Sequence, residues 1–172
     1  MNLAPTASTT ATLAVGDALA IAILNARGFT ETDFARSHPG GSLGRRLLLY
    51  VEDIMHNGPQ VPIVEQSVSL REALVEMTSK GLGMTAVVDQ HKNLVGIYTD
   101  GDLRRSFAKN LSLETPISEL MSRAPVTVGK GVLAAELVAM MKQERISAVL
   151  VVEHAQVVGA LNMQDLLRAG IL

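Results

Sequence analysis

The sequence predicts an α+β fold made of two copies of a β-α-β-β-α unit, packed face to face with pseudo-twofold symmetry. Three observations favour this fold. Most of the chain is an internal repeat, each copy alternates strand-like runs with helical periodicity, and a polar turn divides two strand-like runs in each copy. A unit this small buries little of its surface, so one copy alone would be marginal. We therefore expect one globule formed by both copies.

The copies correspond from their first helical turn onward. VEDIM matches ISELM, which pairs Met55 with Met121, and a short β run (VPIV or VTV) follows each. A helix with a regularly spaced apolar face comes next. Its apolar positions are Leu70, Leu74 and Met77 in the first copy and Leu133, Leu137 and Met140 in the second.

Polar residues mark the remaining boundaries of each copy. Ser69 and Glu72 have the spacing of a capping box at the start of a helix. TAVVDQHKNLVGIYT then aligns without a gap with AVLVVEHAQVVGALN, and each contains a polar hairpin turn. The last helix is expected to begin at Asp100 in the first copy and at Met163 in the second.

The residues before the repeat have a different character. Ser8, Thr9 and Thr10 can cap a helix, and Leu13–Arg27 is apolar nearly all round until Gly28 stops it. A helix without a polar face should be buried on several sides, and the rest of this part cannot cover it. The predicted parts are 1–48, a helical piece of a larger domain; 49–110, the first copy; and 116–172, the second.

A membrane or secretory role for this apolar helix is not favoured. The run ATLAVGDALAIAILNA carries Asp17 near its middle, whereas a span needs about 20 mostly apolar residues. The N-terminus lacks a basic segment followed by a short apolar core. We expect a buried helix and a cytoplasmic protein.

Composition excludes several kinds of chemistry. The net charge of −2 gives no basic excess for nucleic acid or an anionic membrane. The chain has no cysteine, which excludes disulfides, thiolate metal sites and cysteine nucleophiles. His56, His91 and His154 lack metal-ligand spacing, and the last two fall in polar turns where they would be solvated. We expect neither a metal nor a cofactor.

The start of the last helix in each copy carries the first candidate site. Thr99 and Asp102 occupy it in the first copy, and Asn162 and Asp165 in the second. One interpretation is helix capping alone, because each pair has cap spacing. The other is that a carboxylate accepts hydrogen bonds from a ribose diol while free N–H groups face a phosphate. Both interpretations can hold together.

Three arginines are further candidates. Arg104 and Arg105 lie in the first turns of the first copy's last helix, and Arg145 precedes a strand of the second copy, where the first copy has Leu82. Such arginines are often solvated surface charges. A phosphodiester or a sugar-acid carboxylate would need nearby cations, and guanidinium offers a two-pronged donor.

The motifs DIM, SLREALVEM and TAVVDQHKNLVGIYTDGDL, repeated over about residues 50–172, resemble a CBS domain pair, also called a Bateman module. The resemblance implies that the pair binds nucleotides or similar ligands in the cleft between its copies. It also implies that the strands entering the cleft offer backbone groups to a base edge; their residues here are Met84, Thr85, Ser147 and Ala148.

Residues 1–48 narrow the resemblance. LAPTASTTATLAVGDALAIAIL and SHPGGSLGRRLL, followed by a CBS pair, are similar to the end of a sugar isomerase (SIS) domain in the D-arabinose 5-phosphate isomerase family. The resemblance implies that His38 lies in the isomerase active site, where a base must move a proton between adjacent carbons. The Ser/Thr-rich phosphate loop and the acidic residues of that domain would lie upstream. We expect no isomerase activity from this chain alone.

Three functions follow from these resemblances. The first is a regulatory pair that binds CMP-Kdo, the activated end product of the Kdo and lipopolysaccharide pathway, as a feedback ligand. The second is a sensor of AMP or ATP, and the third is a structural module that braces an oligomer. The resemblance also implies a homo-oligomer, with a dimer of CBS pairs and a tetramer in the full enzyme.

Overall fold

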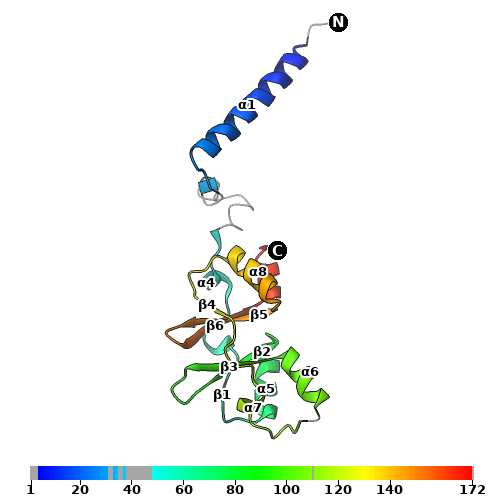
Figure 1. The fold of residues 1–172 in the computed structure, drawn as a ribbon, viewed down its shortest axis with the longest axis vertical. Helices are drawn as coiled ribbons and strands as arrows, with labels where there is room; N and C mark the ends of the chain where they lie inside the picture. Colours follow the sequence, from blue (N-terminus) through cyan, green and yellow to red (C-terminus); the bar gives the residue numbers. More distant parts are fainter. Residues whose placement is uncertain (1–3, 31–32, 35–36, 38–47, 110, 172) are drawn as a thin grey trace. The chain divides into compact units, whose positions relative to one another are not determined.

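The computed structural model describes residues 4–30, 33–34, 37, 48–109 and 111–171, and it divides the chain into two units, 1–47 and 48–172. In the first unit, α1 spans Thr6–Ala26 (Figure 1). The helix begins earlier than predicted, and Ser8, Thr9 and Thr10 lie inside it: their hydroxyls donate to carbonyls three or four residues back and do not cap the helix. Gly28 adopts a positive φ of 62° just beyond its end, as a helix stop requires.

No residue of α1 is buried, so the prediction of a buried helix is wrong for this chain. The helix is apolar on all sides, and the other residues of the first unit are too few to bury it. By length and composition alone α1 could also cross a membrane, a criterion that the core helix of a soluble protein meets equally. The described residues Asp33, Phe34 and Ser37 are helical, and the SHPGG motif lies outside the described residues.

The second unit contains the predicted repeat. The first copy consists of α4 (Val51–Ile54), the 3₁₀ turn η1 (Gly58–Gln60), β1 (Ile63–Glu65), α5 (Leu70–Lys80), β2 (Met84–Val88), β3 (Leu94–Thr99) and α6 (Asp100–Ala108). The second consists of α7 (Ile117–Leu120), β4 (Thr127–Val128), α8 (Ala134–Glu144), β5 (Ala148–Glu153), β6 (Gln156–Asn162) and α9 (Met163–Arg168). The α+β class and the β-α-β-β-α order are confirmed.

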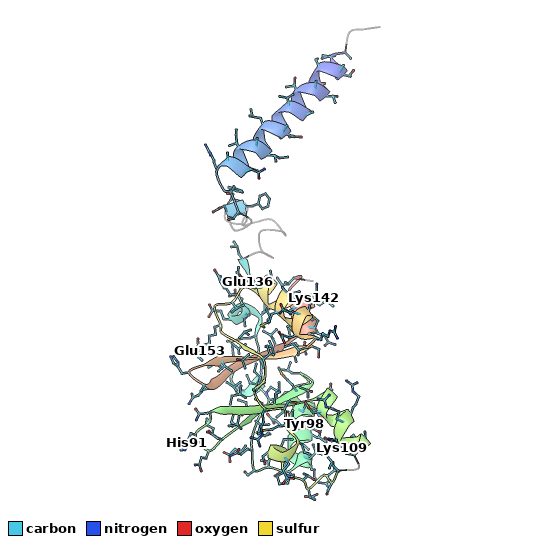
Figure 2. The ribbon with its side chains drawn as sticks, in the orientation of Figure 1. His91, Tyr98, Lys109, Glu136, Lys142 and Glu153 are labelled. Atoms are coloured by element: carbon cyan, nitrogen blue, oxygen red, sulfur yellow. The ribbon has the colours of Figure 1, made fainter. Side chains whose placement is uncertain are left out.

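Each copy forms a three-stranded sheet, β1-β2-β3 or β4-β5-β6, with one parallel and one antiparallel pairing. An apolar cluster that includes Ile97 and Leu150 joins the two sheets, and two further clusters join each sheet to its helices. The unit is therefore layered as helices, sheet, sheet and helices (Figure 1). Figure 2 shows Tyr98 on β3 inside this stack; it is fully buried, and its hydroxyl donates to Ser106 Oγ at 3.0 Å.

The short helices α4 and α7 are exchanged between the copies. Val51 of α4 is buried in the cluster formed by α8, β5 and β6, and its N–H donates to Val132 O at 2.9 Å. Ile117 of α7 is buried with α5, β2 and β3, and its N–H donates to Val68 O at 2.8 Å. Each sheet is thus completed by a segment that belongs to the other copy in sequence, which makes the copies interdependent.

Two glycines accommodate this exchange. A side chain at Gly96 would collide with the thioether of Met121, and one at Gly159 would collide with that of Met55. The methionines that follow α4 and α7 therefore lie directly over the opposite copy's second long strand. The sequence pairs Met55 with Met121 correctly, but their glycine partners become evident only in the structure.

The gapless alignment of the strands is wrong by one residue. Val87 pairs with Gly96 and Val151 with Gly159, but the first hairpin turn closes from Val88 to Leu94 and the second from Val152 to Val157, one residue fewer. The helices shift accordingly. Their buried positions are Leu70, Ala73 and Met77 in α5, and Ala134, Leu137, Val138 and Met141 in α8. The counterpart of Arg145 is consequently Gly81, not Leu82.

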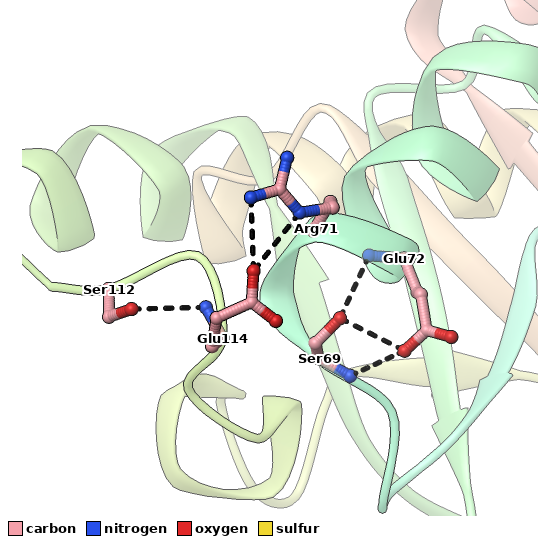
Figure 3. Close-up of polar contacts among 5 residues, drawn as sticks. All are labelled: Ser69, Arg71, Glu72, Ser112 and Glu114. Carbon is pink, nitrogen blue, oxygen red and sulfur yellow. Dashed lines mark hydrogen bonds and ion pairs between the residues drawn. The ribbon is translucent and has the colours of Figure 1, made fainter.

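The predicted capping box at α5 is present, and the linker between the copies is fastened beside it (Figure 3). Ser69 accepts from the Glu72 N–H, and the Glu72 carboxylate accepts from Ser69 N at 2.9 Å. Arg71 donates two hydrogen bonds, of 3.2 and 3.0 Å, to Glu114 of the linker. These contacts hold the chain that leads into α7, and they help place α7 on the first copy's sheet.

Candidate functional site

A cavity of about 470 Å³ opens between the two copies, within the 300–1,000 Å³ typical of small-molecule sites. We call it the inter-copy cavity. The first copy contributes the end of β3 and the start of α6, and the second contributes the segment before β4 and the start of β5. Its lining residues are Gly83, Ile97, Thr99, Asp100, Gly101, Asp102, Arg104, Arg105, Ser122, Pro125, Val126, Arg145, Ile146, Ser147 and Ala148.

Asp102 lies at the junction of helix and cavity. Thr99 is the N-cap of α6, and its N–H and hydroxyl donate to Asp102 Oδ2 at 3.0 and 2.7 Å. Asp102 is buried, with 6% of its surface exposed. Burial raises its pKa, but the hydrogen bonds from Thr99, Arg105 and Ser122 outweigh burial and hold the pKa of Asp102 below its usual value. Asp102 is therefore an ionised acceptor at neutral pH.

The other oxygen of Asp102 is occupied by side chains from both copies. Arg105 Nη2 donates to Oδ1 at 2.6 Å, and Ser122 Oγ donates to the same atom at 2.9 Å. Ser122 follows the exchanged helix α7, so the exchange brings it to the site. This contact could not be predicted from local sequence patterns. Ser122 reaches Asp102 only because α7 packs on the first copy.

Cations and anions share the cavity wall. Arg104 and Arg145 line it from opposite copies, and neither forms an ion pair with any described acidic side chain. Asp100 also lines it, and its backbone N–H donates to Gly83 O at 3.1 Å. With Arg105 and Asp102, the wall holds three guanidinium groups against two carboxylates, which favours an anionic ligand that also carries hydroxyl groups.

Arg145 has a strained backbone. It is the C-cap of α8 in the left-handed region, with φ 56°, where Gly81 caps α5 with φ 70°. A residue with a Cβ pays about 1–2 kcal/mol for this conformation, and glycine does not. In the second copy, the strained backbone of Arg145 therefore coincides with a guanidinium group beside the inter-copy cavity.

We expect Arg145→Gly to raise the free energy of unfolding by about 1 kcal/mol, because it removes this strain. Urea denaturation of the two proteins measures the difference. The matched control is Gly81→Ala, which places a Cβ at the equivalent position with no atom within 4 Å and should lower stability by a similar amount. A loss of stability in Arg145→Gly would contradict the strain argument.

The pseudo-symmetric position in the second copy is built differently. Asn162 and Asp165 form a capping box at α9, but neither residue lines the inter-copy cavity. His56, which follows α4 as Ser122 follows α7, places Nε2 3.0 Å from Asp165 Oδ1. Arg168 lies 3.8 Å from the same oxygen. The second position therefore has a histidine against its carboxylate and Gly81 in place of Arg145.

The remaining predicted site residues divide into two groups. Ser147 and Ala148 line the inter-copy cavity as expected. Met84 and Thr85 are fully buried core residues instead, with the Thr85 hydroxyl 3.5 Å from Ala73 O, and they do not line it. His38 lies outside the described residues. Within the described ranges, no group of three or more His, Cys, Asp or Glu side chains could hold a metal ion.

The two halves of the repeat match the CBS domain over residues 51–109 and 117–171, and the chain belongs to the CBS domain family. Among solved structures, an uncharacterized conserved protein from Pyrococcus horikoshii is similar with a TM-score of 0.65 and 26% identity, over 72% of this chain and 93% of that one. The CBS domain pair of protein MJ0100, in complex with 5′-methylthioadenosine and S-adenosyl-L-methionine, is 30% identical with a TM-score of 0.61, over 70% of this chain and 98% of that one.

Curated relatives extend the match to the residues before the pair. The arabinose 5-phosphate isomerase KdsD of Pseudomonas aeruginosa is 56% identical, and that of Escherichia coli K12 is 50% identical, each over 100% of this chain. The chain spans about half, 53%, of the length of both relatives. The similarity to this isomerase family predicted from residues 1–48 is confirmed.

Proposed function

We propose that this chain is the ligand-sensing CBS pair of an arabinose 5-phosphate isomerase, which interconverts ribulose 5-phosphate and arabinose 5-phosphate. The observation that carries the proposal is the inter-copy cavity, where an ionised Asp102 and three arginines from both copies meet. In such an enzyme His38 would belong to the isomerase active site, and the CBS pair would regulate the activity of that site. The enzyme would be a cytoplasmic homo-oligomer. A ligand would act by favouring a less active arrangement that it binds more tightly.

The lining chemistry favours a nucleotide. A carboxylate suits a ribose diol, since each hydroxyl can donate to it, and guanidinium groups suit phosphate or carboxylate. Three arginines exceed what one phosphate needs. CMP-Kdo carries a ribose diol, a phosphodiester and a sugar-acid carboxylate, so it offers a partner to Asp102 and two anionic groups to Arg104, Arg105 and Arg145. We therefore propose CMP-Kdo as the feedback ligand.

A second candidate is a sensor of adenine nucleotides such as AMP or ATP. One observation favours it: the CBS pair of protein MJ0100, at 30% identity, is in complex with two adenosine derivatives. The base would be read by backbone groups at the start of β5, from Ile146 to Ala148, which line the inter-copy cavity. Cytosine and adenine edges differ in their donors and acceptors, so the two candidates are separable by binding alone.

The asymmetry of the pair supports one ligand for each chain. The second position lacks counterparts of two arginines, since Gly81 corresponds to Arg145 and Leu167 to Arg104. His56 also lies against Asp165 there, whereas the smaller Ser122 contacts Asp102. An anionic ligand therefore finds fewer cations at the second position, and we expect a stoichiometry of one.

The test is a thermal-shift titration with freshly prepared CMP-Kdo and, separately, with CMP, AMP and ATP. A ligand that binds only the folded state raises the melting temperature by mass action. A saturable rise with CMP-Kdo supports the feedback proposal, and a rise with AMP or ATP alone supports the adenine sensor. If no ligand shifts the melting temperature, the nucleotide proposal is wrong and the pair is a structural brace with Thr99 and Asp102 as helix caps.

A further inference from the structure

We propose that Arg105 is a latch on Asp102, released only by a ligand that carries both a diol and an anionic group. Arg105 would thereby determine specificity, by excluding neutral nucleosides from a site whose carboxylate could otherwise hold them. The inference rests on the proposed nucleotide site and specifies which ligands that site would accept.

The first step is that Asp102 has no vacant acceptor position. Oδ2 accepts the N–H and hydroxyl of Thr99, and Oδ1 accepts Arg105 at 2.6 Å and Ser122 at 2.9 Å. A carboxylate offers about four acceptor positions, so these four bonds fill it. A ribose diol can bind Asp102 only by displacing one of these donors.

Arg105 is the donor that can leave. Thr99 and Asp102 belong to one capping box, and Ser122 is held by backbone hydrogen bonds in both directions with Ile97. The Arg105 side chain, in contrast, is 65% exposed and is tied to the buried carboxylate by its guanidinium alone. Arg105 and Asp102 also line a neighbouring cavity of about 290 Å³, which gives the side chain room to move.

The release of Arg105 discriminates between ligands. A neutral nucleoside would take the Oδ1 position and leave the guanidinium without its anion. A nucleotide would take the same position and offer its phosphate to the freed guanidinium, so one charged pair replaces another. The ligand-free protein is thus closed to diols in general and open to diols that carry an anion.

Arg104 provides a matched control. It lies beside Arg105 on α6 and lines the inter-copy cavity, but it is not among the donors to Asp102. Arg104→Met and Arg105→Met each remove one guanidinium and keep an aliphatic stem. Both should weaken binding of an anion, but only Arg105→Met empties a position on the carboxylate.

The experiment is isothermal titration of the wild-type chain and both variants with cytidine, CMP, adenosine and AMP. We expect Arg104→Met to weaken the better-bound nucleotide about tenfold and to leave nucleoside binding unchanged. We expect Arg105→Met to strengthen binding of the matching nucleoside about tenfold, so that the preference for nucleotide over nucleoside collapses.

The outcomes separate this inference from the proposed function. If the wild type binds a nucleotide but nucleoside binding to Arg105→Met is unchanged, weaker or still undetectable, the latch is wrong and the nucleotide site stands. If the wild type binds neither nucleotide, the proposed site is wrong and the latch falls with it.

Discussion

Asp102→Asn is expected to abolish the ligand-induced rise in melting temperature, with the affinity for the nucleotide falling about a hundredfold. A hydrogen bond from a ligand hydroxyl to a charged acceptor contributes about 1.5–3 kcal/mol, and the neutral amide of asparagine removes that charge. The substitution also turns an N–H donor toward groups that already donate, Thr99 on one side or Arg105 and Ser122 on the other. The measurement is titration calorimetry together with the thermal shift.

The control for Asp102→Asn is Asp165→Asn. Both aspartates close a capping box at the start of the last helix of their copy, and both are at most 8% exposed. Both variants should therefore lose a similar amount of stability, about 1–3 kcal/mol. Only Asp102→Asn should lose the response to ligand. Equal responses in the two variants would mean that Asp102 is a helix cap and no more.

Local patterns predicted three helix starts of the repeat correctly, although the caps expected at Ser8, Thr9 and Thr10 are absent from α1. The capping boxes at Ser69, Thr99 and Asn162 depend on residues three positions apart, and all three are present. The repeated strand and helix periodicities predicted the β-α-β-β-α order for the same reason. The one-residue error in the alignment arose in a hairpin turn, where length varies without changing either strand's pattern.

The long-range features could not be read from the sequence. Local sequence patterns do not show that α4 packs on the second copy and α7 on the first. The apolar residues Val51 and Ile117 would suit the core of either copy. Ser122 and His56 follow these helices, so their contacts with Asp102 and Asp165 depend on the same exchange. The candidate site was therefore predicted on its α6 side and only partly on the side that the second copy supplies.

Arg145 shows how a register error changes a functional interpretation. When the two copies are aligned so that Arg145 corresponds to Leu82, Arg145 is only one of several surface cations. Aligned with Gly81, it is a side chain at a position that the first copy reserves for glycine, with φ 56° beside the inter-copy cavity. A strained non-glycine residue at a ligand cavity is a stronger indication of function than its charge alone.

Ile117→Ala is expected to lower the free energy of unfolding by about 2–5 kcal/mol, because Ile117 is fully buried and the lost side chain leaves a cavity. The informative result is where the perturbation falls. Ile117 belongs to the second copy in sequence, yet it packs with Leu70, Val87 and Tyr98 of the first. Methyl NMR should therefore show the larger shift changes at Leu70 and Val87, with chemical denaturation giving the stability loss.

Val51→Ala is the reciprocal variant, since Val51 is equally buried and belongs to the first copy in sequence. It packs in the cluster of Val149, Val151 and Leu161, so its methyl shift changes should fall in the second copy. Its loss of stability should be smaller than that of Ile117→Ala, because valine loses fewer carbons than isoleucine. If each variant instead perturbed its own copy, the exchange of α4 and α7 would be wrong, and with it the route that brings Ser122 to Asp102.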